Sequence, residues 1–388
     1  MQIFVDVSEL IHRDAKSGIQ RVVKNIYYEL RILAGKNISI VPVYGLKDKT
    51  GYYVSKQFDK NFSLGAISYP VIDHEDLPIS FSAGDIFLGL DFQPEIIPLK
   101  REFYSALSKS GVKIIFVVYD ILSLTMPQFF PKGAEENFEK WLRSVFEVAD
   151  EILCISQDVA NECSKWIQIN NPSHKSRLCI LSWNLGANFQ NLTFDKESSS
   201  FFNGDSNENL FSKKINFISV GTIEPRKAHI EILNAFNFLW EQGFDINLIF
   251  VGKHGWNVDE LVCKIKTHPR LNKEFFWFDN LSDSELESIY KIANCLIAAS
   301  HGEGYGLPLI EAAHRNIPII CRDIAVFHEV AANNAQYTSA RNTLIFAEDI
   351  KKWLTQFDKG IVKKSSNIKC ISWRESANHL LKQLQITL

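Results

Sequence analysis

Ser300-His301-Gly302-Glu303-Gly304-Tyr305-Gly306-Leu307-Pro308-Leu309-Ile310-Glu311 is where we expect the functional centre of this chain. It follows the apolar run 295–300, which predicts a buried strand. Pro308 suits the first turn of a helix, because its φ is fixed and it has no N–H. A strand, a glycine loop and a helix therefore follow one another. Backbone N–H groups in such a turn can approach an anion at the positive end of the helix dipole, so we expect a ligand here.

Two carboxylates frame this glycine loop. Glu303 lies at its tip, and Glu311 follows eight residues later near the start of the helix. No lysine or arginine lies between them, so we expect neither to have a local partner. Both would then accept hydrogen bonds from sugar or ribose hydroxyls. The alternative is a helix-capping loop whose acids only complement the helix dipole.

Length and composition exclude several classes of protein. The chain has 388 residues, of which 46% are hydrophobic, and this is enough for two domains. Its 42 basic and 45 acidic residues leave no electrostatic footprint for nucleic acid. Seven cysteines, none in a C-x-x-C pair, indicate a reducing compartment. The N-terminus lacks the basic and apolar regions of a signal peptide, and no uncharged apolar run reaches the length of a membrane span. We expect a cytoplasmic protein, at most in peripheral contact with the inner face of a membrane.

Apolar segments alternate with helical ones along the chain, which predicts parallel sheets covered by helices on both faces. Strands are predicted at 2–7, 38–44, 85–90, 112–119, 151–156, 178–183, 215–220, 246–251, 275–278, 295–300 and 317–321. Helices are predicted at 18–33, 94–110, 138–146, 157–168, 228–242, 258–266, 327–332, 349–357 and 373–384, and from 282 and 308. Ser282 and Glu285 form a capping box.

The alternation is interrupted once, between 188 and 214, by a polar stretch without periodicity. We therefore predict an α/β protein with two tandem Rossmann-like, doubly wound domains that face a central cleft, at residues 1–190 and 214–372. Residues 191–213 would form the linker, and 373–388 a C-terminal helix. Ligands are expected at the carboxyl ends of the strands.

Together with Val220-Gly221-Thr222-Ile223-Glu224-Pro225-Arg226-Lys227, the opening stretch resembles the retaining glycosyltransferases of family 4, which have the GT-B fold. The resemblance extends to the segments 6–10, 17–23, 118–121 and 155–158, so it covers most of the chain. It is strongest to the bacterial mannosyl- and deoxyhexosyltransferases of O-antigen or capsule synthesis. In that family the N-terminal domain binds the acceptor, the C-terminal domain binds the nucleotide sugar, and the last helix returns to the N-terminal domain.

The resemblance also implies a role for individual residues of this sequence. Glu311 would accept from the ribose hydroxyls, Glu303 and the loop N–H groups would hold the donor sugar, and Leu307 would offer its N–H to the diphosphate. The implied donor-binding residues are Gly18, Thr222, Arg226, Lys227, Gly304, Tyr305, Gly306, Leu307 and Glu311. The implied catalytic residues are Asp120, Arg226, Lys227 and Glu303.

Arg226 and Lys227 follow a strand and precede a helix, where they would neutralise the diphosphate as it leaves. The alternative is a solvated pair of cations, but cations are unfavourable near the positive end of a helix. A basic pair in this position therefore favours an anionic ligand.

Two features of the N-terminal half remain open. In many members of the family a histidine that contacts the donor sugar precedes the aspartate that matches Asp120. Tyr119 takes the place of that histidine here, which puts the usual sugar contact in doubt and shifts attention to Asp120. Asp120 would accept from a sugar hydroxyl or position the acceptor; alternatively it caps the following loop. Gly18 would allow close approach to the phosphates or the acceptor, or it would simply begin a helix. The polar segment 6–17 is a candidate acceptor site.

The resemblance thus implies a retaining glycosyltransferase that moves a hexose, mannose from GDP-mannose, to an oligosaccharide or lipid-linked saccharide. No Asp-x-Asp or zinc-like spacing occurs, so we expect no metal, and no cofactor besides the nucleotide-sugar donor. Alternatives are a transferase that uses a UDP- or dTDP-sugar, a GT-B phosphorylase or epimerase, and a non-catalytic subunit that binds a nucleotide sugar.

Overall fold

The computed structural model describes residues 1–35, 37–63, 76–175, 178–187, 211, 214–340 and 342–385. The chain divides into two compact units. Unit 1 comprises Met1–Thr125, Lys132–Gly186 and Ile371–Leu388, and unit 2 comprises Met126–Pro131 and Ala187–Cys370. The linker predicted at 191–213 lies outside the described residues, except for Phe211.

Unit 1 is built on a seven-stranded sheet with the order β3-β2-β1-β4-β5-β6-β7. Its strands are parallel except β3, which runs antiparallel to β2. They are β1 (Gln2–Asp6), β2 (Ser39–Gly45), β3 (Tyr52–Val54), β4 (Ile86–Gly89), β5 (Lys113–Val118), β6 (Glu151–Cys154) and β7 (Cys179–Ser182).

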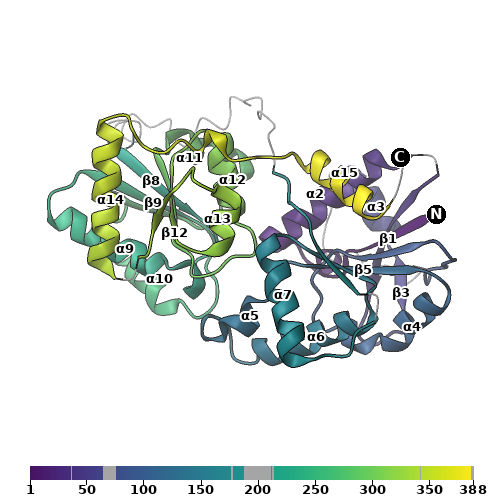
Figure 1. The fold of residues 1–388 in the computed structure, drawn as a ribbon. Coiled ribbons are helices and arrows are strands. Elements are labelled where there is room, and N and C mark those ends of the chain that lie inside the picture. The colour runs from purple at the N-terminus through teal and green to yellow at the C-terminus, as the bar shows by residue number, and fades with distance from the viewer. Residues whose placement is uncertain are drawn as a thin grey trace. The chain divides into compact units, whose positions relative to one another are not determined.

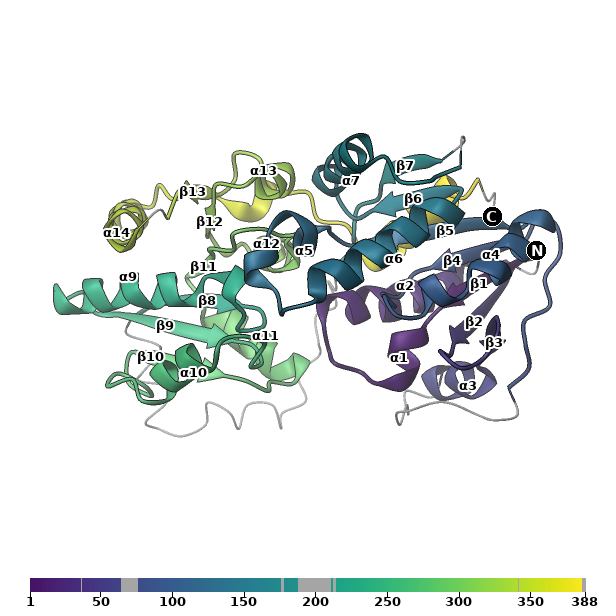
Figure 2. The same cartoon turned by 90° about the horizontal axis from the view of Figure 1, so that it is seen from below.

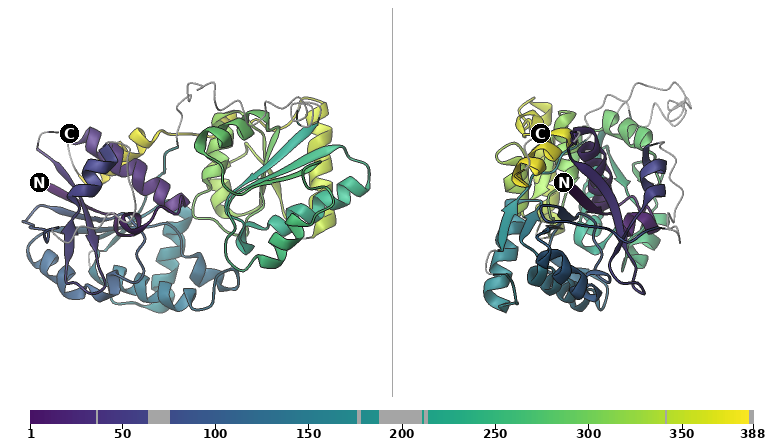
Figure 3. Two further views of the ribbon diagram at one scale, coloured as in Figure 1. Left: turned by 180° about the vertical axis from the view of Figure 1, so that it is seen from behind. Right: turned by 90° about the vertical axis from the view of Figure 1, so that its right-hand side faces the viewer.

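Helices cover both faces of this sheet (Figure 1). They are α1 (Ser8–His12), α2 (Gly18–Leu33), α3 (Lys56–Ser63), α4 (Arg101–Lys109), α5 (Leu122–Thr125), α6 (Ala134–Val148), α7 (Gln157–Asn170) and α15 (Trp373–Gln383), with a 3₁₀ turn at Ile97–Leu99. Helices α4 and α6 bury aromatic and aliphatic side chains against one face. Helix α15 packs against α2 on the other face, so the last helix of the chain lies in the unit where the chain begins (Figure 3). Trp183 fixes it there, donating from Nε1 to the carbonyl of Ser376 at 3.0 Å.

Unit 2 is built on a six-stranded parallel sheet with the order β10-β9-β8-β11-β12-β13. Its strands are β8 (Ile215–Val220), β9 (Ile246–Val251), β10 (Phe275–Phe278), β11 (Cys295–Ala298), β12 (Ile319–Arg322) and β13 (Gln336–Thr338). Its helices are α9 (His229–Glu241), α10 (Asp259–Lys266), α11 (Asp283–Ile292), α12 (Leu307–His314), α13 (Ala325–Ala331) and α14 (Thr343–Asp358).

The helices of unit 2 also form two layers. Helices α9, α10 and α14 cover one face of the sheet, and α11, α12 and α13 cover the other (Figures 1 and 2). Strand order reverses between β8 and β11, because β8 leads to β9 on one side while β11 leads to β12 on the other. Ligands of doubly wound sheets bind at such a switch point, so we expect a ligand beside the segments that follow β8 and β11.

The structure corrects the predicted elements at several places. The predicted helix 94–110 is broken, because Lys100 leaves helical geometry and its buried ammonium group donates to the carbonyls of Leu46 and Lys49. The segment after the first strand contains α1, whose amides at Ser8 and Leu10 are capped by buried carboxylates of Asp6 and Asp91 at 2.9 and 2.8 Å. Besides the 3₁₀ turns, five described elements were not predicted: α1, β3, α3, α5 and β13. In the described part of the chain, every helix is too short or too polar to cross a membrane.

Candidate functional site

The predicted order of strand, glycine loop and helix is confirmed in unit 2. Strand β11 ends at Ala298, the loop follows, and α12 begins at Leu307. Gly306 has a φ of 104°, and a Cβ atom built on it would lie 2.9 Å from the ring of Phe327. A side chain at Gly306 would therefore be strained in both its backbone and its contacts.

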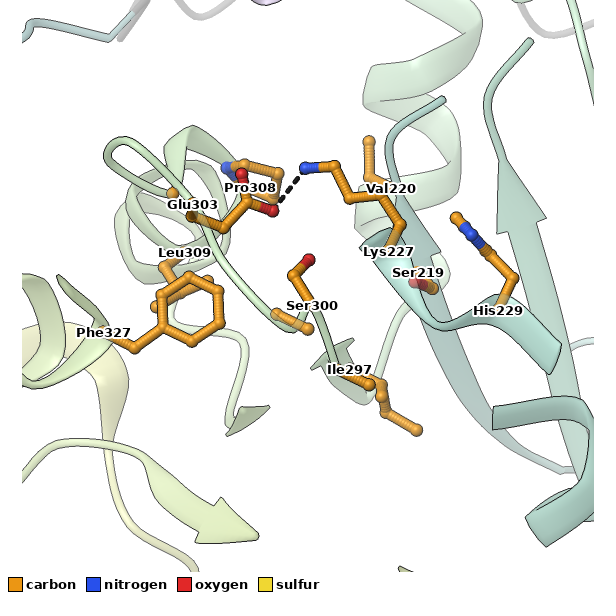
Figure 4. Close-up of a pocket in the computed structure, with 13 residues that line it drawn as sticks. Ser219, Val220, Lys227, His229, Ile297, Ser300, Glu303, Pro308, Leu309 and Phe327 are labelled. Atoms are coloured by element: carbon orange, nitrogen blue, oxygen red, sulfur yellow. Dashed lines mark hydrogen bonds and ion pairs between the residues drawn. The ribbon is translucent and has the colours of Figure 1, made fainter. Parts of the chain in front are cut away.

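Glu303 has partners, although the sequence shows none nearby along the chain. The segment after β8 forms a 3₁₀ turn, Pro225–Lys227, before α9. From this turn the Lys227 ammonium group is ion-paired with Glu303 Oε1 (Figure 4). Arg226 Nη1 lies 2.9 Å from Glu303 Oε2. The sequence predicted only that no partner lies nearby along the chain; both cations come from the loop after another strand of the same sheet.

Arg226 joins the two loops through two hydrogen bonds, besides its ion pair with Glu303. Its guanidinium group donates to the carbonyl of Gly302 and is ion-paired with the Glu224 carboxylate. Its own carbonyl accepts from the amide of His301 at 2.8 Å. The loop after β8 and the glycine loop therefore hold each other, which brings Glu224, Arg226 and Lys227 to Glu303.

Burial and charge act against each other on the two carboxylates. Burial alone would raise the pKa of Glu303, but the charges of Lys227 and Arg226 outweigh it and lower that pKa to about 2. Glu303 is therefore ionised. At Glu224, burial raises the pKa more than Arg226 and Lys227 lower it, and the charge of Glu303 adds to the rise. Arg226 and Lys227 are thus the cationic partners of two buried acids, Glu224 and Glu303.

His229, which the sequence analysis did not single out, lies beside this ion-pair cluster. It is the first residue of α9 and is 1% exposed, and neither ring nitrogen has a hydrogen-bond partner among the described residues. Burial, aided by the charge of Lys227, lowers its pKa to about 3, so the ring is neutral. Nothing in the local sequence marks it, since its burial results from packing on the edge of Phe250, with ring centroids 4.8 Å apart.

A small cavity lies between these side chains. It is lined by Lys227, His229, Ser300, Glu303, Gly306 and neighbouring residues of β8 and β11 (Figure 4). Its volume of about 10 Å³ is close to the least that one water molecule needs. A sugar does not fit inside it, so any ligand of this site would lie outside the cavity or move the side chains that line it.

Glu311 also has a partner, although none was expected nearby along the chain. It lies on α12 and is 5% exposed, and its Oε2 accepts from the Tyr290 hydroxyl at 2.6 Å. Tyr290 comes from α11, the helix before β11, so the partner is again remote in sequence.

The remaining expected residues of unit 2 lie on the same two loops. Thr222 follows β8 and packs beside Gly255, where a Cβ atom would lie 2.9 Å from Thr222 Cγ2. Gly304, Tyr305 and Gly306 form the end of the glycine loop, and Leu307 is the first residue of α12. Their contacts with a ligand remain predictions.

Two expected residues lie in unit 1, at the ends of its own elements. Asp120 follows β5, and its Oδ1 accepts from the amide of Leu122 at 3.0 Å, as the capping alternative predicts. Tyr119 is buried and donates to the carbonyl of Leu90 at 2.7 Å, so its hydroxyl is occupied within unit 1. Gly18 is the first residue of α2, and a Cβ atom there would meet nothing within 4 Å. The described structure therefore gives no steric reason for glycine at this position.

Known proteins resemble the chain in sequence and in structure. Residues 202–365 match the family model described as Glycosyl transferases group 1. The serotype-specific mannosyltransferase WbdA of Escherichia coli is 36% identical over 99% of this chain, and the chain spans 46% of that protein's length. The O-antigen chain mannosyltransferase RfbU of Salmonella typhimurium is 30% identical over 35% of the chain and 36% of its own length. The crystal structure of Anabaena Alr3699/HepE in complex with UDP-glucose covers 99% of both chains with a TM-score of 0.66 and 14% identity. This likeness shows the fold alone, and it confirms the predicted GT-B class with two Rossmann-like domains.

Proposed function

We propose that this chain, whose residues 202–365 match the glycosyl transferases group 1 family model, is a retaining hexosyltransferase that moves mannose from GDP-mannose to a saccharide hydroxyl. The family match and the mannosyltransferase relatives support a glycosyltransferase enzyme. The acceptor would be a growing cell-surface polysaccharide, free or linked to a lipid. The observation that carries the proposal is the ionised Glu303 held by Lys227 and Arg226 at the glycine loop.

This arrangement suits a donor that carries both a diphosphate and a sugar. A diphosphate would compete with Glu303 for Lys227 and Arg226, because charge-assisted hydrogen bonds to phosphate are strong. Glu303, once released, would be an acceptor for the sugar hydroxyls. The negative charge that builds up on the leaving diphosphate would then face two cations and the N-terminus of α12.

Retention would follow from attack on the face that the diphosphate leaves. The bond between sugar C1 and the phosphate oxygen breaks, a bond from C1 to the acceptor oxygen forms, and the leaving phosphate takes the acceptor proton. In this scheme Glu303 binds and does not attack, which agrees with its two ion pairs. Glu311 would accept from the ribose hydroxyls, and Asp120 would position the acceptor.

A donor panel tests the proposal. The purified protein is screened by thermal shift and donor hydrolysis against GDP-mannose, UDP-glucose, UDP-N-acetylglucosamine, dTDP-rhamnose and the free nucleotides, with a chelator present. We expect GDP-mannose and GDP to raise the unfolding temperature, and slow release of GDP. Stabilisation by a UDP- or dTDP-sugar instead would identify that sugar nucleotide as the donor. No stabilisation by any of them would contradict a nucleotide-sugar site.

Two further measurements separate a transferase from a non-catalytic binding subunit. With an acceptor saccharide, NMR of the new anomeric centre should show the configuration of the donor; the opposite configuration would exclude retention. Glu311→Ala should weaken nucleotide binding and abolish transfer together. Donor binding without transfer or hydrolysis in the wild type would favour the binding subunit.

A further inference from the structure

The imidazole ring of His301, which lies in the glycine loop, is held by an acid through its Nε2 atom. His301 Nε2 lies 2.6 Å from Glu231 Oε1, and the Arg322 guanidinium group binds the other oxygen of Glu231. Burial alone would raise the pKa of Glu231, but the hydrogen bonds from His301 and Arg322 and the charge of Arg322 lower it. Because an ionised carboxylate only accepts, His301 Nε2 carries the proton.

Arg322 ties this acid to the sheet. It is 8% exposed at the end of β12 and donates from Nε to the carbonyl of Ala299 at 2.6 Å. Its Nη1 donates to the carbonyl of Ser339 at 3.2 Å. The carboxyl ends of β11, β12 and β13 therefore fix the guanidinium group, which in turn fixes Glu231 on the first turn of α9.

The face of the same imidazole is covered by Phe129. The two rings stack with centroids 4.8 Å apart and an interplanar angle of 17°. Phe129 lies in the segment Met126–Pro131, which belongs to unit 2. Its carbonyl accepts from Trp256 Nε1 at 2.8 Å, and Phe130 stacks on the Trp256 ring. The imidazole is thus fixed both in the plane of its ring and across it.

The backbone around His301 carries this constraint to the site. The His301 amide donates to the carbonyl of Arg226 at 2.8 Å, and the next carbonyl, that of Gly302, accepts from the Arg226 guanidinium group. The backbone of His301 and Gly302 is therefore hydrogen-bonded to Arg226, whose Nη1 lies 2.9 Å from Glu303 Oε2.

We propose that His301 is a positioning residue of the donor site, and that Glu231 and Phe129 hold its ring so that Gly302, Arg226 and Glu303 keep their geometry. The inference rests on the proposed function and adds to it the group that orients the glycine loop. A loop with three glycines has little stiffness of its own, so its precision has to come from its neighbours.

Variants of His301 and Phe129 test the proposal. His301→Ala and Phe129→Leu should each lower kcat/KM for the donor by about 10- to 100-fold, mainly through KM. Phe129→Tyr keeps the stacked ring and should remain within about twofold of the wild type. His328→Ala is the matched control, because His328 also pairs with an acid, Asp323 at 2.6 Å, and stacks on Tyr337, but it has no contact with the glycine loop among those described.

Calorimetry with GDP and thermal unfolding complete the test. A folded His301→Ala protein with weakened GDP binding supports the proposal, as does loss in Phe129→Leu together with rescue in Phe129→Tyr. If His301→Ala and Phe129→Leu behave like His328→Ala, the proposal is wrong. Failure of this inference can be told apart from failure of the proposed function. A wild-type protein that binds no nucleotide contradicts the function, whereas unaffected His301 and Phe129 variants contradict only the inference. A double-mutant cycle of His301 and Phe129 in thermal unfolding tests their coupling without any ligand.

Discussion

The ammonium group of Lys227 is ion-paired with the carboxylate of Glu303 across 76 positions of sequence. Both side chains are largely buried, with 15% and 11% of their surface exposed. In the proposed function, the cation that would bind the diphosphate is thus held by the acid that would bind the sugar. Binding of one part of a donor would release the group that binds the other.

Glu303→Gln should separate binding of the nucleotide from transfer of the sugar. Without the carboxylate charge, Lys227 and Arg226 lose a competitor, so the affinity for GDP should rise by about 3- to 10-fold. Transfer should fall by at least about 100-fold, since the acceptor for the sugar hydroxyls is weakened. Calorimetry and a transfer assay measure the two effects, with Glu260→Gln on the surface of α10 as the control. Weaker GDP binding in Glu303→Gln would contradict the competition.

The stability that Glu303 contributes should depend on acid pH. Its pKa is about 2 in the folded protein against an ordinary value of 4.5, so the contribution is full above pH 4.5. It is lost as the pH falls from 4.5 to about 2, because the unfolded chain then binds more protons. The difference in unfolding free energy between wild type and Glu303→Gln should shrink over this range. A difference that does not change with pH would show that the two ion pairs add no stability.

His229→Phe should stabilise the protein, most at acid pH. The change removes two buried nitrogens that lack partners among the described residues and keeps a ring against Phe250. Unpaired buried polar groups cost about 1–3 kcal/mol. Because the pKa of His229 falls from 6.5 to about 3 on folding, the wild type loses stability as the pH falls through that range. Thermal unfolding should show that the difference in stability between His229→Phe and the wild type widens as the pH falls. A variant less stable than the wild type would mean that a water molecule forms a hydrogen bond with the His229 ring.

Tyr290→Phe should cost stability through Glu311. The variant keeps the aromatic ring under Arg315, whose guanidinium carbon lies 4.6 Å from its centroid, and removes only the hydroxyl that donates to Glu311. Loss of a donor to a buried carboxylate should lower the unfolding free energy by about 1–3 kcal/mol. Urea denaturation measures the change, with Tyr53→Phe as a control, since no hydrogen bond from the Tyr53 hydroxyl is described. Equal effects of the two variants would argue against the importance of the Tyr290 bond.

The fold could be predicted from the sequence wherever local pattern reflects burial. The predicted limits of β8, β9 and β10 are those observed, because each is a short apolar run in a sheet covered by helices on both faces. The capping box of Ser282 and Glu285 is also confirmed, since it is local by nature. Strands β3 and β13 were missed because three-residue strands at the edge of a sheet show no period.

The candidate site could be predicted only in its backbone. The glycine loop and the start of α12 follow from Gly306 and Pro308, whose conformations are set by their own chemistry. The partners of Glu303 and Glu311 depend on which strands become neighbours, and no spacing in the sequence contains that information. The same holds for His301 and Glu231, which are 70 positions apart.

The segment Met126–Pro131 has a consequence for inheritance. It is encoded within the N-terminal half, yet it supplies the ring that covers His301 and the carbonyl that binds Trp256. Recombination between two related genes near residue 187 would therefore join a C-terminal half to a foreign copy of this hexapeptide. Hybrids that carry residues 126–131 from the same parent as 187–370 should retain function more often than those that exchange the halves at a single crossover.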